Sequence, residues 1–244
     1  MGIKFSVNEK YFDKWSHEMA YVLGYLYADG NLLHDQFSRG RYVSVTSIDE
    51  GMINTVKRLL NSEHTIVIGP AHDNNKSRFT LRMGNAALFN SLIKRGLYPN
   101  KSLTVRMPEI PDKFIRDFVR GYFDGDGCVY LYRSKGITAD LIVRKLSIIF
   151  TSGSVKFLED LLELLRYNLD LKQSKVYKGH RSFQLRFATS DTVKIFKFIY
   201  HGSGGLFLDR KLEIFKKYFQ LRPVRVDNGI SSILRLRGIG HVVK

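Results

Sequence analysis

The first hundred residues carry three distinct patterns of apolar and polar positions. Residues 78–83 place an apolar side chain at every second position, which predicts a β-strand with one buried face. Residues 49–60 place apolar side chains three and four positions apart, as an amphipathic helix does. Residues 16–28 carry apolar side chains on every face and no proline, so they predict a buried helix. We expect it to stop at Gly30, in the left-handed conformation that is common at helix ends.

The rest of the chain extends these patterns into one repeated order. In the first half, residues 32–48 predict two strands around a polar turn, residues 65–69 predict a third, and residues 85–95 predict a helix that ends at Gly96. In the second half, helices are predicted over 112–125, 154–166 and 190–200, and strands over 128–134, 144–151, 172–178 and 181–188. The predicted order in each half is therefore α-β-β-α-β-β-α. Prolines within residues 100–113 mark the connector, and ILRLR near the C-terminus predicts a short strand.

Segments of the two halves also match in sequence. Residues 20–32 and 117–129 share the pattern G-Y-[LF]-[YD]-[AG]-D-G, which separates Asp29 from Asp126 by 126 − 29 = 97 positions. Two further echoes follow in the same order, RFTLRM against SFQLRF and, more weakly, YPNKSL against LDRKLE. Ordered echoes indicate a duplicated unit. We predict an α+β fold with one unit over residues 1–104, a second over 105–222, and a tail over 223–244.

A formal net charge of +16 and a pI near 9.9 change the functional picture. Such a positive excess is unfavourable by self-repulsion, so we expect a polyanionic partner such as nucleic acid. The alternative is a basic protein selected only for solubility, which acidic residues serve better. Cys128 is the only cysteine, which excludes an internal disulfide and a cysteine-based zinc site.

The sequence also bears on the cellular compartment. It shows no apolar run of a signal peptide and no stretch near the roughly 18 apolar residues of a membrane helix. A single thiol fits a reducing compartment. We expect an intracellular protein, in the cytoplasm or nucleoid of a microbe or in an organelle, that is not secreted and has no membrane partner.

Asp29 and Asp126 each occupy the last turn of a predicted helix, directly before a glycine. A carboxylate there is unfavourable by about 0.3–1 kcal/mol, because the C-terminal end of a helix carries partial negative charge. One such placement fits a simple helix-stop turn, but two at matching positions of a repeat favour a compensating cation. If the two helices pack side by side, the carboxylates meet. Their hard oxygens then predict Mg²⁺, with scissile phosphates as further ligands.

Small residues four positions apart give each of these helices a flat stripe. Gly24 and Ala28 lie on the first helix, and Gly121 and Gly125 lie on the second. Such stripes let two helix backbones approach closely. We therefore predict that a pair of packed motif helices joins the two units. The sequence contains no HExxH pair, no G-x-S-x-G and no P-loop that would indicate a different chemistry.

The segments VLGYLYADG (22–30) and VRGYFDGDG (119–127) resemble the two signature motifs of the single-chain LAGLIDADG homing endonucleases, and the resemblance extends over residues 16–219. It implies a monomer with two pseudo-symmetric halves, each with a curved four-stranded antiparallel sheet that straddles the DNA major groove. It also implies double-strand cleavage of a long specific target, leaving staggered ends. The expected metal is Mg²⁺ or Mn²⁺, with Ca²⁺ as a non-catalytic substitute.

The resemblance also implies roles for individual residues. The expected metal ligands are Asp29, Asp126, Ala28 and Gly125. The other acidic position of the motif, which is not the essential one, holds Tyr27 in the first copy and Asp124 in the second, and we expect Asp124 to be packed or solvated.

Two further pairs of residues correspond to positions that support catalysis in the family. The basic residue near the metal in each half corresponds to Lys101 and Lys211, which would stabilise charge that develops on the phosphate. The alternative is that both are ordinary surface lysines. The polar residue at the end of the second strand, which positions the attacking water, corresponds to Ser47 and Ser152.

The polar faces of the predicted strands are the expected DNA contacts. The alternating strands contribute Arg78, Thr80, Arg82, Ser182, Gln184 and Arg186. The other strands and turns contribute Arg39, Arg41, Ser44, Thr46, Lys76, Arg133, Lys145, Lys175 and Lys178. Arginine and glutamine read base edges, and both also contact phosphates, so we expect a strongly salt-dependent affinity for double-stranded DNA. The alternative is a solvated polar sheet face.

Three other functions fit the same fold. An RNA maturase that assists intron splicing, and a DNA-binding regulator that does not cleave, need not keep both acids, so their presence favours a nuclease. An endonuclease embedded in an intein is a third possibility. The chain starts with Met and shows no flanking Cys, Ser or His-Asn splicing junction, so we expect a free-standing or intron-encoded protein.

Overall fold

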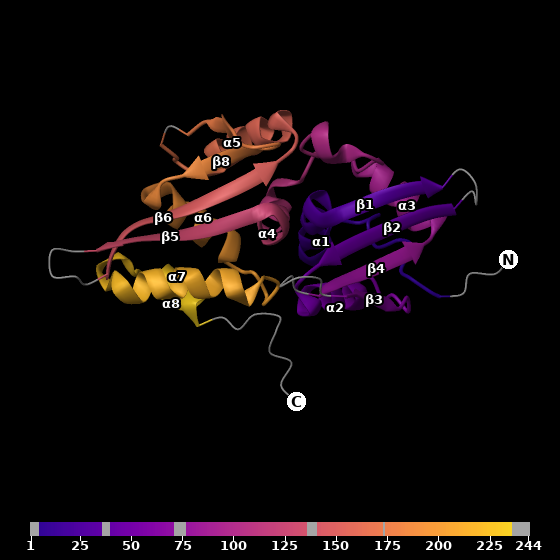
Figure 1. Cartoon of the computed structure of the whole chain (residues 1–244), viewed down its shortest axis with the longest axis horizontal. Helices are drawn as coiled ribbons and strands as arrows, with labels where there is room; N and C mark the ends of the chain where they lie inside the picture. The colour runs from indigo at the N-terminus through magenta and orange to yellow at the C-terminus, as the bar shows by residue number, and fades with distance from the viewer. Residues whose placement is uncertain (1–4, 36–39, 71–76, 136–140, 173, 236–244) are drawn as a thin grey trace. The chain divides into compact units, whose positions relative to one another are not determined.

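The computed structural model describes residues 5–35, 40–70, 77–135, 141–172 and 174–235 (Figure 1). Contacts between residues group the chain into two compact units. Unit 1 comprises Met1–Lys101 and Pro108–Gly125, and unit 2 comprises Ser102–Met107 and Asp126–Lys244. Each unit contains one four-stranded antiparallel sheet.

Unit 1 contains the predicted elements of the first half together with the second motif helix. Its helices are α1 (His17–Asp29), α2 (Glu50–Leu59), α3 (Ala86–Lys94) and α4 (Ile115–Asp126), of which the last residue belongs to unit 2. Its strands are β1 (Gly30–Asp35), β2 (Gly40–Ser47), β3 (Ile66–Gly69) and β4 (Arg78–Gly84), ordered β1-β2-β4-β3 in the sheet. The strand register places Val45 opposite Leu81 and Val43 opposite Met83, all buried. Because α2 and α3 pack against β2 and β4, this face of the sheet forms the core.

Unit 2 repeats the arrangement. Its strands are β5 (Gly127–Lys135), β6 (Leu141–Ser152), β7 (Val176–Lys178) and β8 (Phe183–Phe187), ordered β5-β6-β8-β7. Its helices are α5 (Val155–Asn168), α6 (Thr189–Tyr200), α7 (Asp209–Leu221) and α8 (Asn228–Leu234). Ile148 pairs with Phe187 and Phe150 with Leu185, all buried under α5 and α6. The predicted α+β class, with two four-stranded antiparallel sheets in α-β-β-α repeats, is confirmed.

The C-terminal part departs from the prediction in two ways. First, α7 was not predicted, although Leu212, Phe215 and Phe219 recur at helical spacing and are buried. Second, the strand predicted for ILRLR is wrong where the structure describes it, because this segment begins as the end of α8. Ile230 and Ile233, one helical turn apart, are both buried there. No helix in the described ranges has the length and apolar character needed to cross a bilayer.

Gly30 ends α1 for a reason other than the predicted one. Its φ of −79° and ψ of 144° are extended, not left-handed, and β1 begins at this residue. A Cβ at this position would lie 2.4 Å from the carbonyl oxygen of Leu26, so the lack of a side chain lets the chain leave the helix directly into the strand. Gly96 follows the end of α3, where the helix was predicted to stop, and its φ of +88° is left-handed.

Within unit 1, α1 and α4 pack backbone against backbone. A Cβ at Gly24 would lie 2.0 Å from the carbonyl oxygen of Phe118, and a Cβ at Gly121 would lie 2.0 Å from that of Tyr21. Real Cβ atoms do not approach so closely, so only glycine fits at either crossing point. The predicted stripes of small residues therefore do line the contact between these two helices.

Candidate active site and nucleic-acid interface

Asp29 is the last residue of α1 and is half-buried. One turn earlier, the hydroxyl of buried Tyr25 forms hydrogen bonds with the Asp29 carboxylate and with Ser47. Burial, and next the charge of Asp29, raise the pKa of Tyr25 far above its usual range. The phenol therefore stays protonated and donates to the carboxylate, which fixes its orientation.

The last turn of α4 passes directly beside Asp29. A Cβ at Gly125 would lie 2.3 Å from the Cβ of Ala28 and 3.3 Å from Oδ2 of Asp29. The absence of a side chain at Gly125 therefore lets the backbone of α4 pack against Ala28 and lie next to this carboxylate. Asp126 follows Gly125 in the chain; it is the last residue of α4 and is exposed.

Lys101 is not an ordinary surface lysine, because its side chain is only 7% exposed. Its Nζ donates to the carbonyl oxygen of Tyr27 at 2.7 Å and lies 3.4 Å from that of Ala28. These carbonyls form the negative end of α1 next to Asp29, so the ammonium offsets both the helix dipole and the carboxylate. The structure thus places a buried positive charge at the end of the first motif helix.

Lys211 has the matching place in unit 2. It lies in the first turn of α7, is 3% exposed, and donates from Nζ to the carbonyl oxygen of Gly127 at 2.6 Å. Gly127 is the residue that follows Asp126, so each motif ends beside a buried lysine. The pairing of YPNKSL with LDRKLE in the sequence was the only signal for this similarity.

The two serines lie at corresponding strand ends. Ser47 ends β2, and its hydroxyl accepts a hydrogen bond from the backbone N–H of Asp49 at 3.1 Å. Ser152 ends β6 and accepts from the backbone N–H of Ser154 at 3.1 Å. Both hydroxyls therefore shape the turn into the next helix, and Ser47 is also linked to Asp29 through Tyr25.

Asp124, the acid at the other motif position, is packed. It is buried, and its Oδ2 accepts a hydrogen bond from the hydroxyl of Tyr21 at 2.8 Å. Nearby on α4, buried Arg120 forms an ion pair with Asp117 at 2.6 Å and lies over the ring of Tyr21. These groups stabilise the contact between α1 and α4 in unit 1.

The face of the first sheet that lies opposite the core carries most of the predicted contacts of this half. The register places Ser44 opposite Arg82, and Thr46 opposite Thr80, with which it shares a hydrogen bond of 2.9 Å. The Arg82 guanidinium stacks 4.1 Å from the centre of the Tyr42 ring. Arg78 lies on the same face, by its spacing along β4.

Arg41 is separated from this group. Arg41 lies two residues before the buried Val43 in β2, so alternation along the strand puts it on the core side of the sheet. Its guanidinium donates to Asn90 of α3 at 2.9 Å and lies near the ring of Phe89. Arg39 and Lys76 fall outside the described residues, and Arg133 lies in β5 with its side chain outside them.

The corresponding face of the second sheet is richer in aromatic side chains. Gln184 pairs with Thr151 and Arg186 with Ile149 across the sheet, and Arg186 donates twice to the side-chain oxygen of Gln184. Lys145 lies opposite Tyr132 in the sheet. Lys175 directly precedes β7, and Ser182 directly precedes β8. Lys178 pairs with Phe183, on the core-facing side of the edge strand β7.

Three exposed tyrosines on this face, Tyr130, Tyr132 and Tyr177, were not among the predicted contacts. The alternation of β5, with Val129 buried and Tyr130 exposed, was the signal that could have found two of them.

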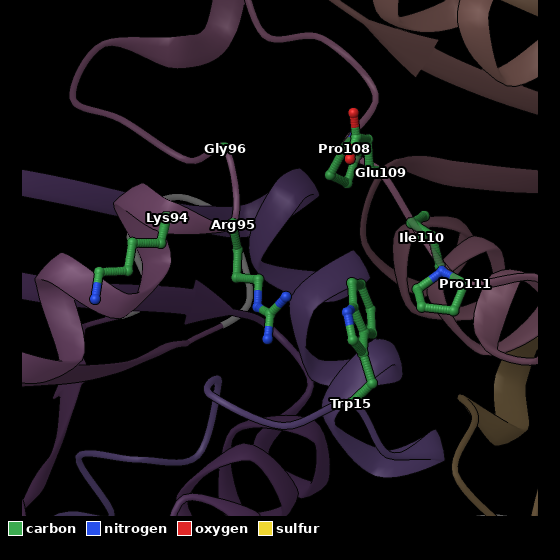
Figure 2. Close-up of a pocket in the computed structure, with 8 residues that line it drawn as sticks. All are labelled: Trp15, Lys94, Arg95, Gly96, Pro108, Glu109, Ile110 and Pro111. Carbon is green, nitrogen blue, oxygen red and sulfur yellow. The ribbon is translucent and has the colours of Figure 1, made fainter.

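A hollow in unit 1 lies beside the segment that precedes α4 (Figure 2). It measures about 510 Å³ and is lined by Trp15, Lys94, Arg95, Gly96, Pro108, Glu109, Ile110 and Pro111. The Arg95 guanidinium lies 4.8 Å from the Trp15 ring and donates to the carbonyl oxygens of Phe12 and Asp13. Arg95 thereby ties the segment before α1 to the end of α3, so we interpret the hollow as structural.

Comparisons with known proteins identify the fold. A family model described as "LAGLIDADG-like domain" matches residues 113–199. The structure of the LAGLIDADG meganuclease I-AabMI bound to uncleaved DNA has a TM-score of 0.57 at 12% identity, covering 87% of this chain and 95% of that one. The I-LtrWI LAGLIDADG homing endonuclease bound to target DNA has a TM-score of 0.55 at 14% identity, covering 93% and 96%. I-SmaMI bound to uncleaved DNA with calcium ions has a TM-score of 0.56 at 14% identity, covering 91% and 98%.

A curated relative is the probable translation initiation factor IF-2 of Methanocaldococcus jannaschii, 27% identical over 175 residues. The match covers 66% of this chain but only 14% of the length of that protein. From the family match and the structural likenesses, the chain has the LAGLIDADG homing endonuclease fold.

Proposed function

We propose that this protein is a divalent-metal-dependent endonuclease that recognises a long duplex DNA target as a monomer and cuts both strands, leaving staggered ends. The observation that carries the proposal is the surroundings of Asp29: its carboxylate is oriented by Tyr25, lies beside the backbone of Gly125 on the second motif helix, and is accompanied by buried Lys101. The net charge of +16 and the likeness to nucleases solved with DNA support a polyanionic duplex as the substrate.

Asp29 and Asp126 are the residues that would hold Mg²⁺ or Mn²⁺, with the backbone at Ala28 and Gly125 beside them. When bound, the ion would polarise the scissile phosphate and acidify a water molecule. In the described part of the chain, no group of three or more His, Cys, Asp or Glu side chains is placed to hold a metal. Mg²⁺ commonly keeps several waters and substrate oxygens as ligands, so a site with two protein carboxylates fits this ion.

The other groups of the site supply positive charge and orient the Asp29 carboxylate. Lys101 and Lys211 supply positive charge next to the two motif ends, where negative charge would develop on a phosphate during cleavage. Tyr25 orients the Asp29 carboxylate, and Ser47 completes that hydrogen-bond chain. Ser152 is proposed to serve the second half in the same way.

The polar sheet faces are the proposed DNA contacts. Arg82 and Thr80 on the first face, and Gln184 and Arg186 on the second, offer the side-chain types that read base edges and bind phosphates. Arg41 is already engaged with α3, so we expect it to contribute less than Ser44 or Thr46.

A selection from randomised duplex DNA tests the proposed activity. The purified chain is incubated with a plasmid library in Mg²⁺, and linearised molecules are sequenced. We expect one long site to be enriched, cut on both strands at staggered positions, with no product in EDTA. Site-independent degradation, or cleavage that persists without a divalent metal, would contradict the proposal.

A further inference from the structure

The second sheet is incomplete at one corner. β6 spans Leu141–Ser152, but β8 pairs with it only from Ile148 to Ser152. Beyond Ile148, side chains replace the missing strand: the Thr189 hydroxyl bonds both the N–H and the C=O of Leu146. Residues 145–147 of β6 therefore border an opening between β6 and the start of α6, next to the segment that leads into β7.

This opening is a cavity of about 730 Å³, which lies in the size range of small-molecule sites. Its lining consists of Lys145, Leu146, Ser147, Lys172, Ser174, Tyr177, Arg186, Phe187, Ala188, Thr189, Ser190 and Asp191. Three separate segments thus bring side chains to one hollow: β6, β8 with the start of α6, and the chain around β7.

The cations that line the hollow are not neutralised by acids. Lys145, Lys172 and Arg186 come from different segments, and in the described residues no carboxylate forms an ion pair with any of them. Arg186 donates to Gln184, a neutral acceptor. Asp191 is the only acid in the lining; it is buried, and its carboxylate accepts the backbone N–H of Lys172 at 3.1 and 3.2 Å. The hollow is therefore suited to an anion.

An aromatic ring lies beside these cations. Tyr177 is 43% exposed. The Nζ of Lys175 lies 5.4 Å from the centre of its ring, and the guanidinium carbon of Arg186 lies 5.9 Å from it. An exposed ring offers a surface on which a base can stack, and cations nearby bind the attached phosphate. A nucleotide combines these two features in one molecule.

We propose that this hollow is a nucleotide pocket, which stacks a base on Tyr177 and binds its phosphate among Lys145, Lys172 and Arg186. The ligand chemistry is a nucleoside 5′-phosphate, either free or as an unpaired nucleotide of a strand that lies on the sheet. A base within an intact duplex cannot enter, because its faces are already stacked. The pocket is independent of Asp29 and Asp126, so it goes beyond the proposed cleavage activity.

Binding assays on the full chain in EDTA test the pocket without requiring cleavage. A fluorescein-labelled single-stranded DNA octamer is titrated by anisotropy, and deoxyadenosine 5′-monophosphate by calorimetry. The test variants are Lys172→Ala and Tyr177→Ala. Their matched controls are Lys217→Ala, an exposed lysine of α7 outside the lining, and Tyr167→Ala, an exposed tyrosine of α5. Thermal melting confirms that each variant is folded.

We expect Tyr177→Ala to weaken octamer binding about fivefold or more, the lower end of what the loss of one base–aromatic stack costs. We expect Lys172→Ala to weaken it more than either control, because a phosphate contact is lost, and each control to change it less than about twofold. The same pattern with the mononucleotide would identify a free nucleotide as a ligand; the pattern with the octamer alone would identify an unpaired nucleotide of a strand. Both results support the pocket. No binding by either probe, or equal losses in Lys172→Ala and Lys217→Ala, would overturn it. A chain that binds the octamer in this way but cuts no duplex would contradict only the proposed nuclease.

Discussion

Replacing Asp29 or Asp126 by Asn is expected to lower the rate of duplex cleavage in Mg²⁺ by more than about a hundredfold. Loss of a residue that only hydrogen-bonds to a metal ligand costs up to about a hundredfold, and loss of the ligand itself should cost more. The amide keeps the size of the carboxylate but removes the charge that would hold the cation. Binding to the duplex should persist in Ca²⁺ or EDTA, because removing a negative charge does not weaken attraction to phosphates. Cleavage is followed on a linear duplex that carries the selected site, and binding by gel shift.

Asp13→Asn is a matched control for this experiment. Asp13 is exposed, and it bonds Arg95 through its backbone oxygen, so the substitution makes the same charge change in unit 1 away from the motif helices. Its cleavage rate should equal that of the unchanged chain. Full activity in either Asp29→Asn or Asp126→Asn would refute the metal assignment for that residue.

Replacing Gly24 or Gly121 by Ala is expected to lower the free energy of unfolding by about 2 kcal/mol or more, within or beyond the range for overpacked sites. Either new Cβ would lie 2.0 Å from a backbone carbonyl oxygen of the facing helix, and a backbone atom cannot rotate away as a side chain can. α1 and α4 would have to move apart, which would also disturb the hydrogen bond between Tyr21 and Asp124. Urea unfolding followed by circular dichroism measures the change.

Gly51→Ala, in the same unit, is expected to raise the free energy of unfolding instead of lowering it. Gly51 lies in α2, is exposed, and a Cβ there meets no atom within 4 Å. Alanine should therefore stabilise the helix by up to about 1 kcal/mol, because glycine loses more conformational freedom in a helix. If all three substitutions gave equal stability, the close approach of α1 and α4 would be disproved.

Most of the fold could be predicted because its signals are local and repeated. The alternation in residues 78–83 predicted β4, and the buried Leu81 and Met83 confirm it. The stripes of small residues predicted the crossing of α1 with α4. The conformation of Gly30 was not predictable in this way, since helix-end statistics favour a left-handed residue, while the direct passage into β1 demands extended backbone with no side chain.

The site was predicted less completely, because spacing gives the face of a strand but not the partners of a side chain. The sequence could not show that Lys101 and Lys211 would be buried against helix-end carbonyls, or that Tyr25 would join Asp29 to Ser47. It also placed Arg41 with the DNA contacts, although its position in β2 turns it toward Asn90. The register of β2 that decides this depends on the pairing with β1 and β4, which single-segment patterns do not fix.

Locating the bound metal tests most directly whether Asp29 and Asp126 hold one site together. Crystals of the full chain with its selected duplex and Mn²⁺ would be measured at a wavelength where manganese scatters anomalously. We predict an anomalous peak whose ligands include carboxylate oxygens of both Asp29 and Asp126 at coordination distance, roughly 2.0–2.4 Å, together with an oxygen of the scissile phosphate. A chain bound to its duplex with manganese on neither aspartate, or on only one of them, would contradict it.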